Sequence, residues 1–315
     1  MFSRRCPRFL TLVALLAVVP CLGAEPSTQP AVPDSFMRFV DDGHGGGSLQ
    51  TADVAFRNPA GVAVHLIAAV HIGEKSYYDG LNRDFKGYDA VLYELVKSQN
   101  AAPPVPGDAE KSDNPISELQ VLLKSFLDLD FQLDDIDYTA ANFVHADLDR
   151  ETFEKMQAER GESFEQLMLR QIIRAFTEGP ATQPAAEDDA DVDLIAMLTH
   201  PDAERQMKVV IARQLGQMDL SAMGLDGPGG SVLVTERNKA ALKVLGDSMA
   251  AGKRNMAIFY GAAHMSDMTK RLEAMGFSPV STRWNLAWDL TIRANQPSAV
   301  EKLMRNLVHS INDGT

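Results

Sequence analysis

Residues 62–94 decide the fold of this chain; they read VAVHLIAAVHIGEKSYYDGLNRDFKGYDAVLYE. Residues 62–70 are almost all apolar and rich in β-branched side chains, the composition of a strand that is buried on both faces. A helical pattern follows over 75–85, and then a second apolar run ends near Glu94. Strand, helix and strand in this order predict a βαβ unit with two parallel strands. The carboxyl ends of such strands share one edge of the sheet, where α/β proteins bind ligands, and His71 and Glu94 both fall there.

Other segments extend this sheet on both sides. Residues 49–57 alternate as a strand does, and the turn signal at 58–61 predicts an antiparallel hairpin with the strand that follows. A late apolar run over 256–260 precedes a helical pattern over 266–275, and 278–284 is typical of a last strand. We therefore predict an α/β fold with a mixed, partly parallel sheet flanked by helices.

Residues 1–24 have the layout of a secretory signal peptide. Three arginines precede an apolar stretch over 9–19 that is too short to cross a bilayer, and small residues over 22–24 offer a cleavage site. We expect the product to be exported, as a periplasmic or secreted protein. Both cysteines, Cys6 and Cys21, lie in this segment. The mature chain would contain no thiol, which excludes disulfides, thiolate metal sites and cysteine nucleophiles.

The rest of the chain reads as one domain with additions. Residues 25–35 form a Pro-rich linker that we expect to be disordered, and 36–315 form a single α/β domain. Within it, a mostly helical insertion or cap spans about 113–251 and contains an acidic low-complexity loop over 177–193. The formal net charge is −13, and loss of the signal segment's three arginines leaves −16. This charge disfavours nucleic acid as a partner, and no further apolar run predicts stable membrane insertion.

Two strands of the predicted sheet finish in a similar way, with Ala68-Ala69-Val70-His71 and Gly261-Ala262-Ala263-His264. Small residues before each histidine let the backbone approach a ligand closely. Together with Glu94 these histidines make a His–Glu–His set of nitrogen and oxygen donors, which divalent metals prefer. We predict that His71, Glu94 and His264 meet at one sheet edge.

Each of these residues also has a purely structural interpretation. A histidine at a strand end is often only a hydrogen-bonded structural residue, and we expect His65 to be one. A buried carboxylate such as Glu94 could be paired with an arginine, and Arg237 is a candidate for that partner. Arg237 could instead bind a substrate carboxylate or oxyanion, or lie on a solvated helix face. His145 could reach the sheet edge from the middle segment.

These short motifs resemble the TraB/GumN/TIKI family, whose members carry an early and a late G-x-x-H motif and a glutamate that closes the strand after the first. The match covers His71 with its strand, Glu94, Glu236-Arg237-Asn238 and the GAAH at 261–264. One departure is Ala68, where the family usually has glycine. The resemblance implies a mixed α/β fold and, for some members, metal-dependent peptidase activity with manganese or cobalt.

From these residues and this resemblance we predict a metal-dependent hydrolase that acts on peptide or protein substrates. His71, Glu94 and His264 would hold a divalent cation, with manganese or cobalt favoured by the resemblance and zinc also possible. Glu94 would serve as ligand or general base, and Arg237 would stabilise the developing oxyanion. Because other members of the family have no established activity, the alternative is a non-catalytic ligand- or peptide-binding protein of the same fold.

Overall fold

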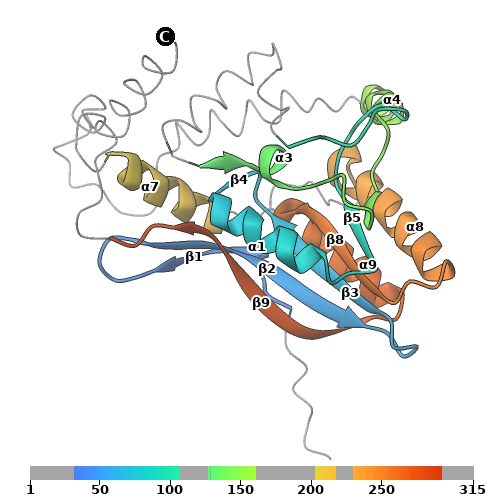
Figure 1. Ribbon diagram of the computed structural model, residues 1–315, viewed down its shortest axis with the longest axis horizontal. Helices are drawn as coiled ribbons and strands as arrows, with labels where there is room; N and C mark the ends of the chain where they lie inside the picture. Colours follow the sequence, from blue (N-terminus) through green and yellow to red (C-terminus); the bar gives the residue numbers. More distant parts are fainter. Residues whose placement is uncertain (1–31, 107–126, 128, 161–202, 218–229, 293–315) are drawn as a thin grey trace, which may run out of the picture.

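The structure is a computed structural model that describes residues 32–106, 127, 129–160, 203–217 and 230–292. Figure 1 shows these residues as one twisted sheet with helices packed on it. The predicted signal peptide (1–24), most of the predicted linker and the acidic loop at 177–193 lie outside the described residues.

Seven strands of the described residues form one sheet in the order β1-β2-β3-β8-β5-β7, with β9 paired to the other side of β2. The strands β3, β8, β5 and β7 are parallel, whereas β1, β2 and β9 join the sheet through antiparallel pairs. The prediction of a mixed, partly parallel sheet is therefore confirmed. The strand bounds are β1 (Met37–Asp41), β2 (Gly47–Arg57), β3 (Ala63–Ala69), β5 (Ala90–Tyr93), β7 (Phe143–His145), β8 (Asn255–Gly261) and β9 (Ser278–Asp289).

The βαβ unit is present, with α1 at Lys75–Phe85, the bounds that the helical pattern predicts. Its two strands, β3 and β5, are parallel but not adjacent, because the later strand β8 lies between them. The hydroxyl groups of Tyr77 and Tyr78 donate to the carbonyl oxygens of Ala68 and Val70, at 3.2 and 3.1 Å. These bonds fix the start of α1 to the end of β3, directly before His71.

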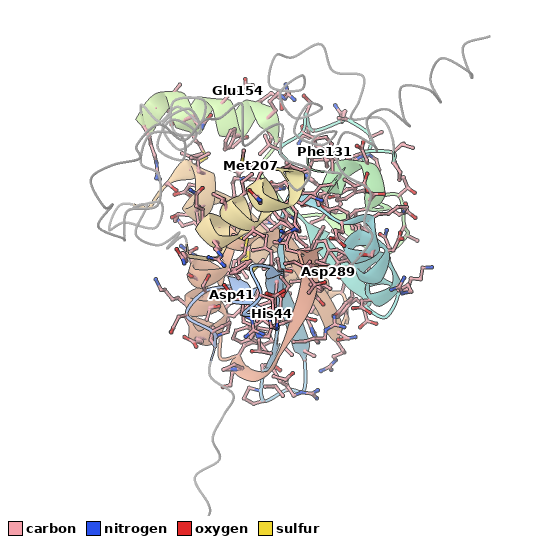
Figure 2. All side chains as sticks on the ribbon, turned by 90° about the vertical axis from the view of Figure 1, so that its left-hand side faces the viewer. Asp41, His44, Phe131, Glu154, Met207 and Asp289 are labelled. Carbon is pink, nitrogen blue, oxygen red and sulfur yellow. The ribbon has the colours of Figure 1, made fainter. Side chains whose placement is uncertain are left out.

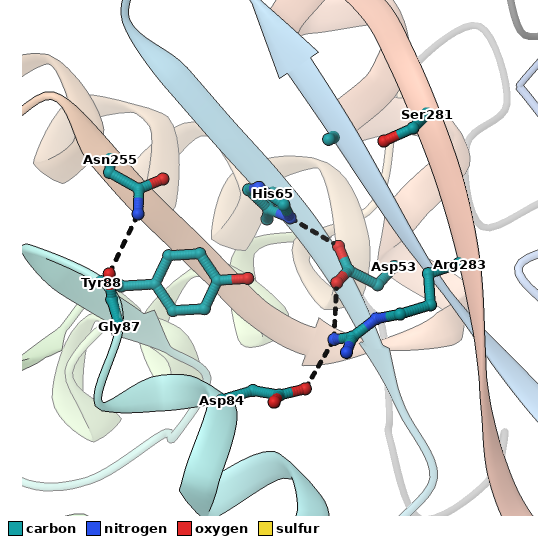
Figure 3. A pocket seen from close by; sticks show the side chains of 9 residues that line it. Asp53, His65, Asp84, Gly87, Tyr88, Asn255, Ser281 and Arg283 are labelled. Carbon is teal, nitrogen blue, oxygen red and sulfur yellow. Dashed lines mark hydrogen bonds and ion pairs between the residues drawn. The ribbon is translucent and has the colours of Figure 1, made fainter.

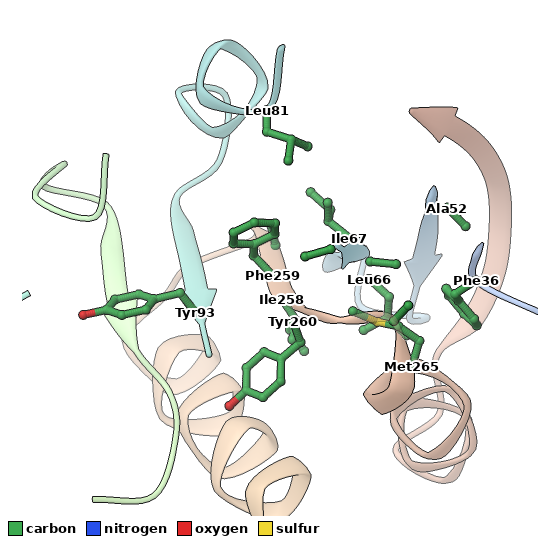
Figure 4. Close-up of a cluster of buried hydrophobic side chains, with 14 of the residues drawn as sticks. Phe36, Ala52, Leu66, Ile67, Leu81, Tyr93, Ile258, Phe259, Tyr260 and Met265 are labelled. Carbon is green, nitrogen blue, oxygen red and sulfur yellow. The ribbon is translucent and has the colours of Figure 1, made fainter. Parts of the chain in front are cut away.

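Helices cover both faces of the parallel strands. The helices α8 (Arg237–Ala250) and α9 (Met265–Ala274) lie on the face opposite α1. Side chains of β8 alternate between the two layers: Phe259 lies with Leu81 of α1, whereas Tyr260 lies toward the other face with Met265 (Figure 4). All four of these side chains are almost fully buried. Burial of an aliphatic or aromatic side chain contributes about 1.5–3 kcal/mol, so this double-sided core is the main source of stability.

The middle of the chain contributes strands as well as helices. Here β7 extends the main sheet beside β5, and a two-stranded sheet joins β4 to β6. A strand as short as β7 leaves no periodic signal in the sequence. Of this small sheet, β4 (Ile72–Gly73) lies between β3 and α1, and β6 is Asp130–Phe131; the helices of the middle part are α3 (Gln132–Asp135), α4 (Arg150–Arg160) and α7 (Ala203–Gln217).

Helix α7, which carries Met207, packs across β1 and β2 (Figure 2). An ion pair of 2.5 Å between Arg213 and Asp41 fixes the helix to the end of β1. Nowhere in the described ranges is a helix both long and apolar enough to cross a membrane.

Leu66 tests the contribution of the core, because it lies on β3 and is completely buried. We expect Leu66→Ala to lower the free energy of unfolding by about 2–5 kcal/mol, since the substitution leaves a cavity. Val40 is 40% exposed on β1, and Val40→Ala should change stability by no more than about 0.5 kcal/mol. Urea unfolding of the two variants measures both changes, and equal losses would contradict the assignment of β3 to the core.

Asp89 gives the start of β8 a pH-dependent anchor. Its carboxylate accepts hydrogen bonds from the backbone N–H groups of Arg254 and Asn255, at 2.8 and 2.9 Å. These bonds hold the pKa of Asp89 below its ordinary value. The stabilisation is therefore complete above the pKa of the unfolded chain, near 3.8, and is lost as the pH falls through the lower folded pKa.

We expect Asp89→Asn to be less stable than the parent chain at pH 6–7 by an amount that does not vary within that range. The difference should shrink as the pH falls below about 4, because the parent carboxylate is then protonated as well. Urea unfolding at several pH values measures it. A difference that grows toward low pH would contradict the assigned pKa shift.

Candidate functional site

The carboxyl ends of three neighbouring parallel strands form the candidate site. His71 follows β3, Glu94 follows β5, and His264 ends the short turn η3 (Ala262–His264) after the central strand β8. The strand order β3-β8-β5 places Gly261, the last residue of β8, between the other two strand ends. A methyl group built on Gly261 would lie 3.3 Å from Oε2 of Glu94, 3.7 Å from Nε2 of His71 and 3.9 Å from Cδ2 of His264. The structure therefore brings the three predicted residues together around one point.

Glu94 is held ionised in this position. Its side chain is only 11% exposed, yet Oε1 contacts Nη2 of Arg237 at 2.8 Å and Oε2 accepts the backbone N–H of Gly261 at 2.6 Å. Burial alone would raise the pKa of Glu94, but the charge of Arg237 and the hydrogen-bonding contact with His264 outweigh burial and hold the pKa well below its usual value. The carboxylate is therefore a fixed negative charge at the end of β5.

Arg237 is in turn held by Asp147, whose side chain is fully buried. Nε and Nη2 of Arg237 donate to the two carboxylate oxygens of Asp147 at 2.9 and 2.6 Å, the bidentate geometry that suits a guanidinium group. The structure thus places Arg237 against Glu94, as the structural interpretation of the sequence proposed. A role in oxyanion binding remains a prediction.

The local fold explains how Arg237 reaches the site. The preceding residues form a π-turn, η2 (Val232–Glu236), in which the Glu236 N–H donates to the carbonyl oxygen of Ser231. The Ser231 hydroxyl accepts from the N–H of Val234 and so caps the turn. Such π-helical turns are rare and are frequently found at functional sites. Because η2 ends at Glu236, Arg237 and Asn238 begin helix α8 at the edge of the sheet.

A glutamine fixes the tautomer of His71. Oε1 of Gln132 lies 3.1 Å from Nδ1 of His71, while Nε2 of Gln132 donates to the hydroxyl of Tyr138 at 2.8 Å. An amide oxygen can only accept, so Nδ1 of His71 carries the proton. This leaves a lone pair on Nε2 of His71, which is the His71 atom that lies closest to the methyl position on Gly261.

An asparagine does the same for His264, which is 4% exposed. Oδ1 of Asn238 lies 2.7 Å from Nδ1 of His264, and Nδ2 of Asn238 donates to the His264 carbonyl and to Asp267. Nδ1 of His264 is therefore the donor, and Nε2 faces Oε1 of Glu94 at 3.4 Å. A lone pair and a carboxylate that face each other at this distance need a cation between them, either a proton or a metal ion.

Two other histidines are structural. Nδ1 of His65 pairs with Asp53 at 2.8 Å, as expected of a structural residue on β3. His145 lies on β7, and its Nε2 contacts the carbonyl oxygen of Leu95 at 2.6 Å. Neither imidazole belongs to the group around Gly261.

Sequence reasoning did not identify Gln132, Tyr138 or Asp147, and it gave Asn238 little weight. Gln132, Tyr138 and Asp147 carry no motif of their own. Gln132 and Asp147 contact residues 61 and 90 positions away in the chain, and Tyr138 contacts Gln132. The only sequence signal was the position of Asn238 directly after Arg237 in the resemblance to the TraB/GumN/TIKI family.

As the side chains stand, no three His, Cys, Asp or Glu residues in the described ranges are close enough together to bind a metal ion. The separation of 3.4 Å between Glu94 and His264 does suit two ligands of one ion, because metal–ligand bonds of about 2 Å place neighbouring donors at such distances. Nε2 of His71 lies near the same point, 3.7 Å from the methyl position on Gly261.

Comparisons of the chain with family models, curated proteins and solved structures found no match. The resemblance to the TraB/GumN/TIKI family therefore remains a prediction that rests on the motif residues alone.

Asp147 tests the hydrogen-bonded charge network. We expect Asp147→Asn to lower the free energy of unfolding by about 3–5 kcal/mol. The substitution removes the buried negative charge that pairs with Arg237 and leaves the guanidinium group with one carboxylate fewer. The control is Asp79→Asn, which breaks an exposed pair with Lys75 and should cost at most about 1 kcal/mol. Chemical unfolding at pH 7 compares the two. Equal losses would show that Asp147 does not hold the network.

Proposed function

We propose that this chain is an exported metal-dependent hydrolase that cleaves peptide bonds. The observation that carries the proposal is the arrangement of donors around Gly261: amide oxygens hold Nδ1 of His71 and of His264, so each Nε2 lone pair is available beside the Glu94 carboxylate. Outer residues that fix the tautomer of an imidazole are typical of metal-binding histidines.

The charge of the site also suits a divalent cation. Arg237 is matched by Glu94 and Asp147, so the three groups together carry one net negative charge. The imidazoles add none when Nε2 is unprotonated. Two nitrogen donors and one carboxylate form a set that zinc, manganese and cobalt all accept. The family resemblance favours manganese or cobalt.

A cation held by His71, Glu94 and His264 would supply Lewis-acid activation of water and of the scissile carbonyl. The residues of the chain have separate tasks in this scheme. Because the pKa of Glu94 is so low, its carboxylate is a ligand and a poor general base at neutral pH. Nε and Nη2 of Arg237 already contact the carboxylates of Asp147 and Glu94. Nη1 is therefore the donor that would bind an oxyanion.

A non-catalytic binding protein is the second candidate, and one observation favours it. Arg237 already contacts Oε1 of Glu94, so the carboxylate is partly neutralised before any ligand arrives. A site of this kind could bind a ligand without turning it over. Cleavage of a peptide library in the presence of Mn²⁺ or Co²⁺ separates the two candidates, because the binding protein yields no products.

Gly261 offers the sharpest test of the metal site. Its backbone (φ −53°, ψ 144°) is one that any residue adopts, so alanine brings no backbone strain. The added methyl group would nevertheless sit among the three donors. We expect Gly261→Ala to weaken Mn²⁺ or Co²⁺ binding at least tenfold and to cost no more than about 1–3 kcal/mol of stability. Equilibrium dialysis followed by elemental analysis measures the metal bound per chain.

Gly246→Ala is the matched control, because a methyl group there meets no atom within 4 Å. Gly246 lies within α8, so alanine should raise stability by about 0.5–1 kcal/mol and leave metal binding unchanged. A parent chain that binds neither ion would refute the metal site, and the cation between Glu94 and His264 would then be a proton. Equal metal binding by the parent and Gly261→Ala would show that the ion binds elsewhere.

A further inference from the structure

A polar cavity of about 390 Å³ lies over the face of β2, β3 and the start of β8. It lies toward the amino ends of β3 and β8, whereas the candidate metal site lies at their carboxyl ends. Ala55 of β2 lines the cavity and pairs with His65 of β3 on one side and with Ser281 of β9 on the other. Paired residues of neighbouring strands point to the same face of a sheet, so the small side chain of Ala55 leaves room between two longer ones. Ligand sites for small molecules have volumes of about 300–1,000 Å³.

A chain of charged side chains forms one wall of this cavity (Figure 3). The carboxylate of Asp53 is 4% exposed and contacts Nδ1 of His65 at 2.8 Å and Nη2 of Arg283 at 3.0 Å. The same Nη2 contacts the carboxylate of Asp84, in the last turn of α1, at 2.6 Å. Apolar side chains would cover a sheet face at a lower desolvation cost than a buried carboxylate with two partners. This wall therefore favours a role in binding over a role in stability alone.

Asp53 holds the imidazole of His65 in one orientation. A carboxylate can only accept, so Nδ1 of His65 carries a proton. The contact that makes His65 a structural residue of β3 thus leaves its other nitrogen, Nε2, without a partner among the described residues. The side chain of His65 lines the cavity and is 26% exposed. A histidine whose Nδ1 is held by a carboxylate is the arrangement in which proteins present Nε2 to a bound molecule.

Three more polar groups of the cavity have no hydrogen-bond partner among the described residues: the hydroxyls of Tyr88 and Ser281 and Oδ1 of Asn255. Nδ2 of Asn255 donates to the carbonyl oxygen of Gly87 at 3.0 Å, which directs Oδ1 away from that carbonyl. The hydroxyl of Tyr88 points toward the wall that contains Asp53 (Figure 3). Burial and the charge of Asp53 raise the pKa of Tyr88 above its usual value, so this hydroxyl stays neutral and can both donate and accept.

The charges of the cavity favour a neutral ligand. Asp53, Asp84 and Arg283 together carry one net negative charge, and protonation of His65 would bring the sum only to zero. The cavity therefore has no excess positive charge for an anion. Arg283 itself occupies the place between the two carboxylates that a ligand cation would take. Groups that both donate and accept are matched by ligand hydroxyls, which do the same.

We propose that this cavity binds a neutral sugar ring, with one ligand hydroxyl on Nε2 of His65 and others on the hydroxyls of Tyr88 and Ser281. A ligand hydroxyl suits Nε2 in either protonation state of the imidazole, because it can donate or accept. The proposal is independent of the metal site, which uses other residues at the opposite ends of the strands.

The probes are D-glucose, D-galactose and D-mannose, each titrated to 50 mM into the full ¹⁵N-labelled chain and followed by NMR. We expect at least one sugar to cause saturable shifts of the backbone amide signals of residues 53–55 and 281–283 and of the Nε2 signal of His65. The sugar that binds is then compared with its 2-amino-2-deoxy analogue, which is a cation, and with its uronate, which is an anion. Neither charged analogue should bind more tightly than the neutral sugar.

Substitutions in the wall test the contacts of the proposed ligand. Tyr88→Phe and Ser281→Ala each remove one hydroxyl and should weaken binding about three- to tenfold. Ala55→Leu fills the space between the strands and should abolish binding. The matched controls are Ser76→Ala and Val40→Leu, at exposed positions that do not line the cavity, and they should change the affinity less than twofold. If Ala55→Leu does not fold, the two hydroxyl variants carry the test.

Four results would overturn the proposal. One is a lack of saturable shifts with all three sugars at 50 mM. Another is an affinity that neither Tyr88→Phe nor Ser281→Ala changes. A third is tenfold tighter binding of a charged analogue, which would assign the cavity to an ion. The last is a set of shifts centred on His71 and His264, which would place the sugar at the other end of the sheet.

Discussion

The burial of a charged glutamate at the end of β5 is the constraint on which the site depends. A carboxylate that is 11% exposed is unstable without partners, and Glu94 finds them in Arg237 and in the backbone N–H of Gly261. Arg237 is itself buried and needs the bidentate carboxylate of Asp147. Each group is thus satisfied only while the next is in place. The network therefore fixes the relative positions of β5, β8, the strand end after β7 and the start of α8.

Local patterns in the sequence were sufficient for the parts of the fold that they encode. Helix α1 occupies the 75–85 that its periodicity predicts, and Gly261 and His71 lie at or just after the ends of β8 and β3. The meeting of His71, Glu94 and His264 also followed from the sequence, because carboxyl ends of neighbouring parallel strands share one edge. Three residues that are far apart in the chain become neighbours because their strands are parallel. To predict this, it is enough to assign the strands correctly.

Features built from long-range contacts could not be predicted in this way. The three-residue strand β7 is too short to show a period, so the segment before Asp147 read as part of a helical region. Gln132 and Asn238 act through single hydrogen bonds to imidazoles 61 and 26 residues away. An amide side chain carries no signal of its partner in one sequence. The residues that hold the site in place are therefore harder to predict than those that form it.

The backbone around His71 explains how an exposed imidazole can have a defined place. The His71 carbonyl accepts from the N–H of Gln132, and β4, which follows His71, pairs with β6. On the other side, Nε1 of Trp288 donates to the Ile72 carbonyl at 2.8 Å, and the N–H of Glu74 donates to β9. The segment between β3 and α1 is thus fixed from two directions, although His71 itself is exposed. The hydrogen bonds of Trp288 and Ala287 connect the C-terminal end of β9 to the residues directly after His71. A displacement of that end of β9 would therefore displace the backbone that carries His71.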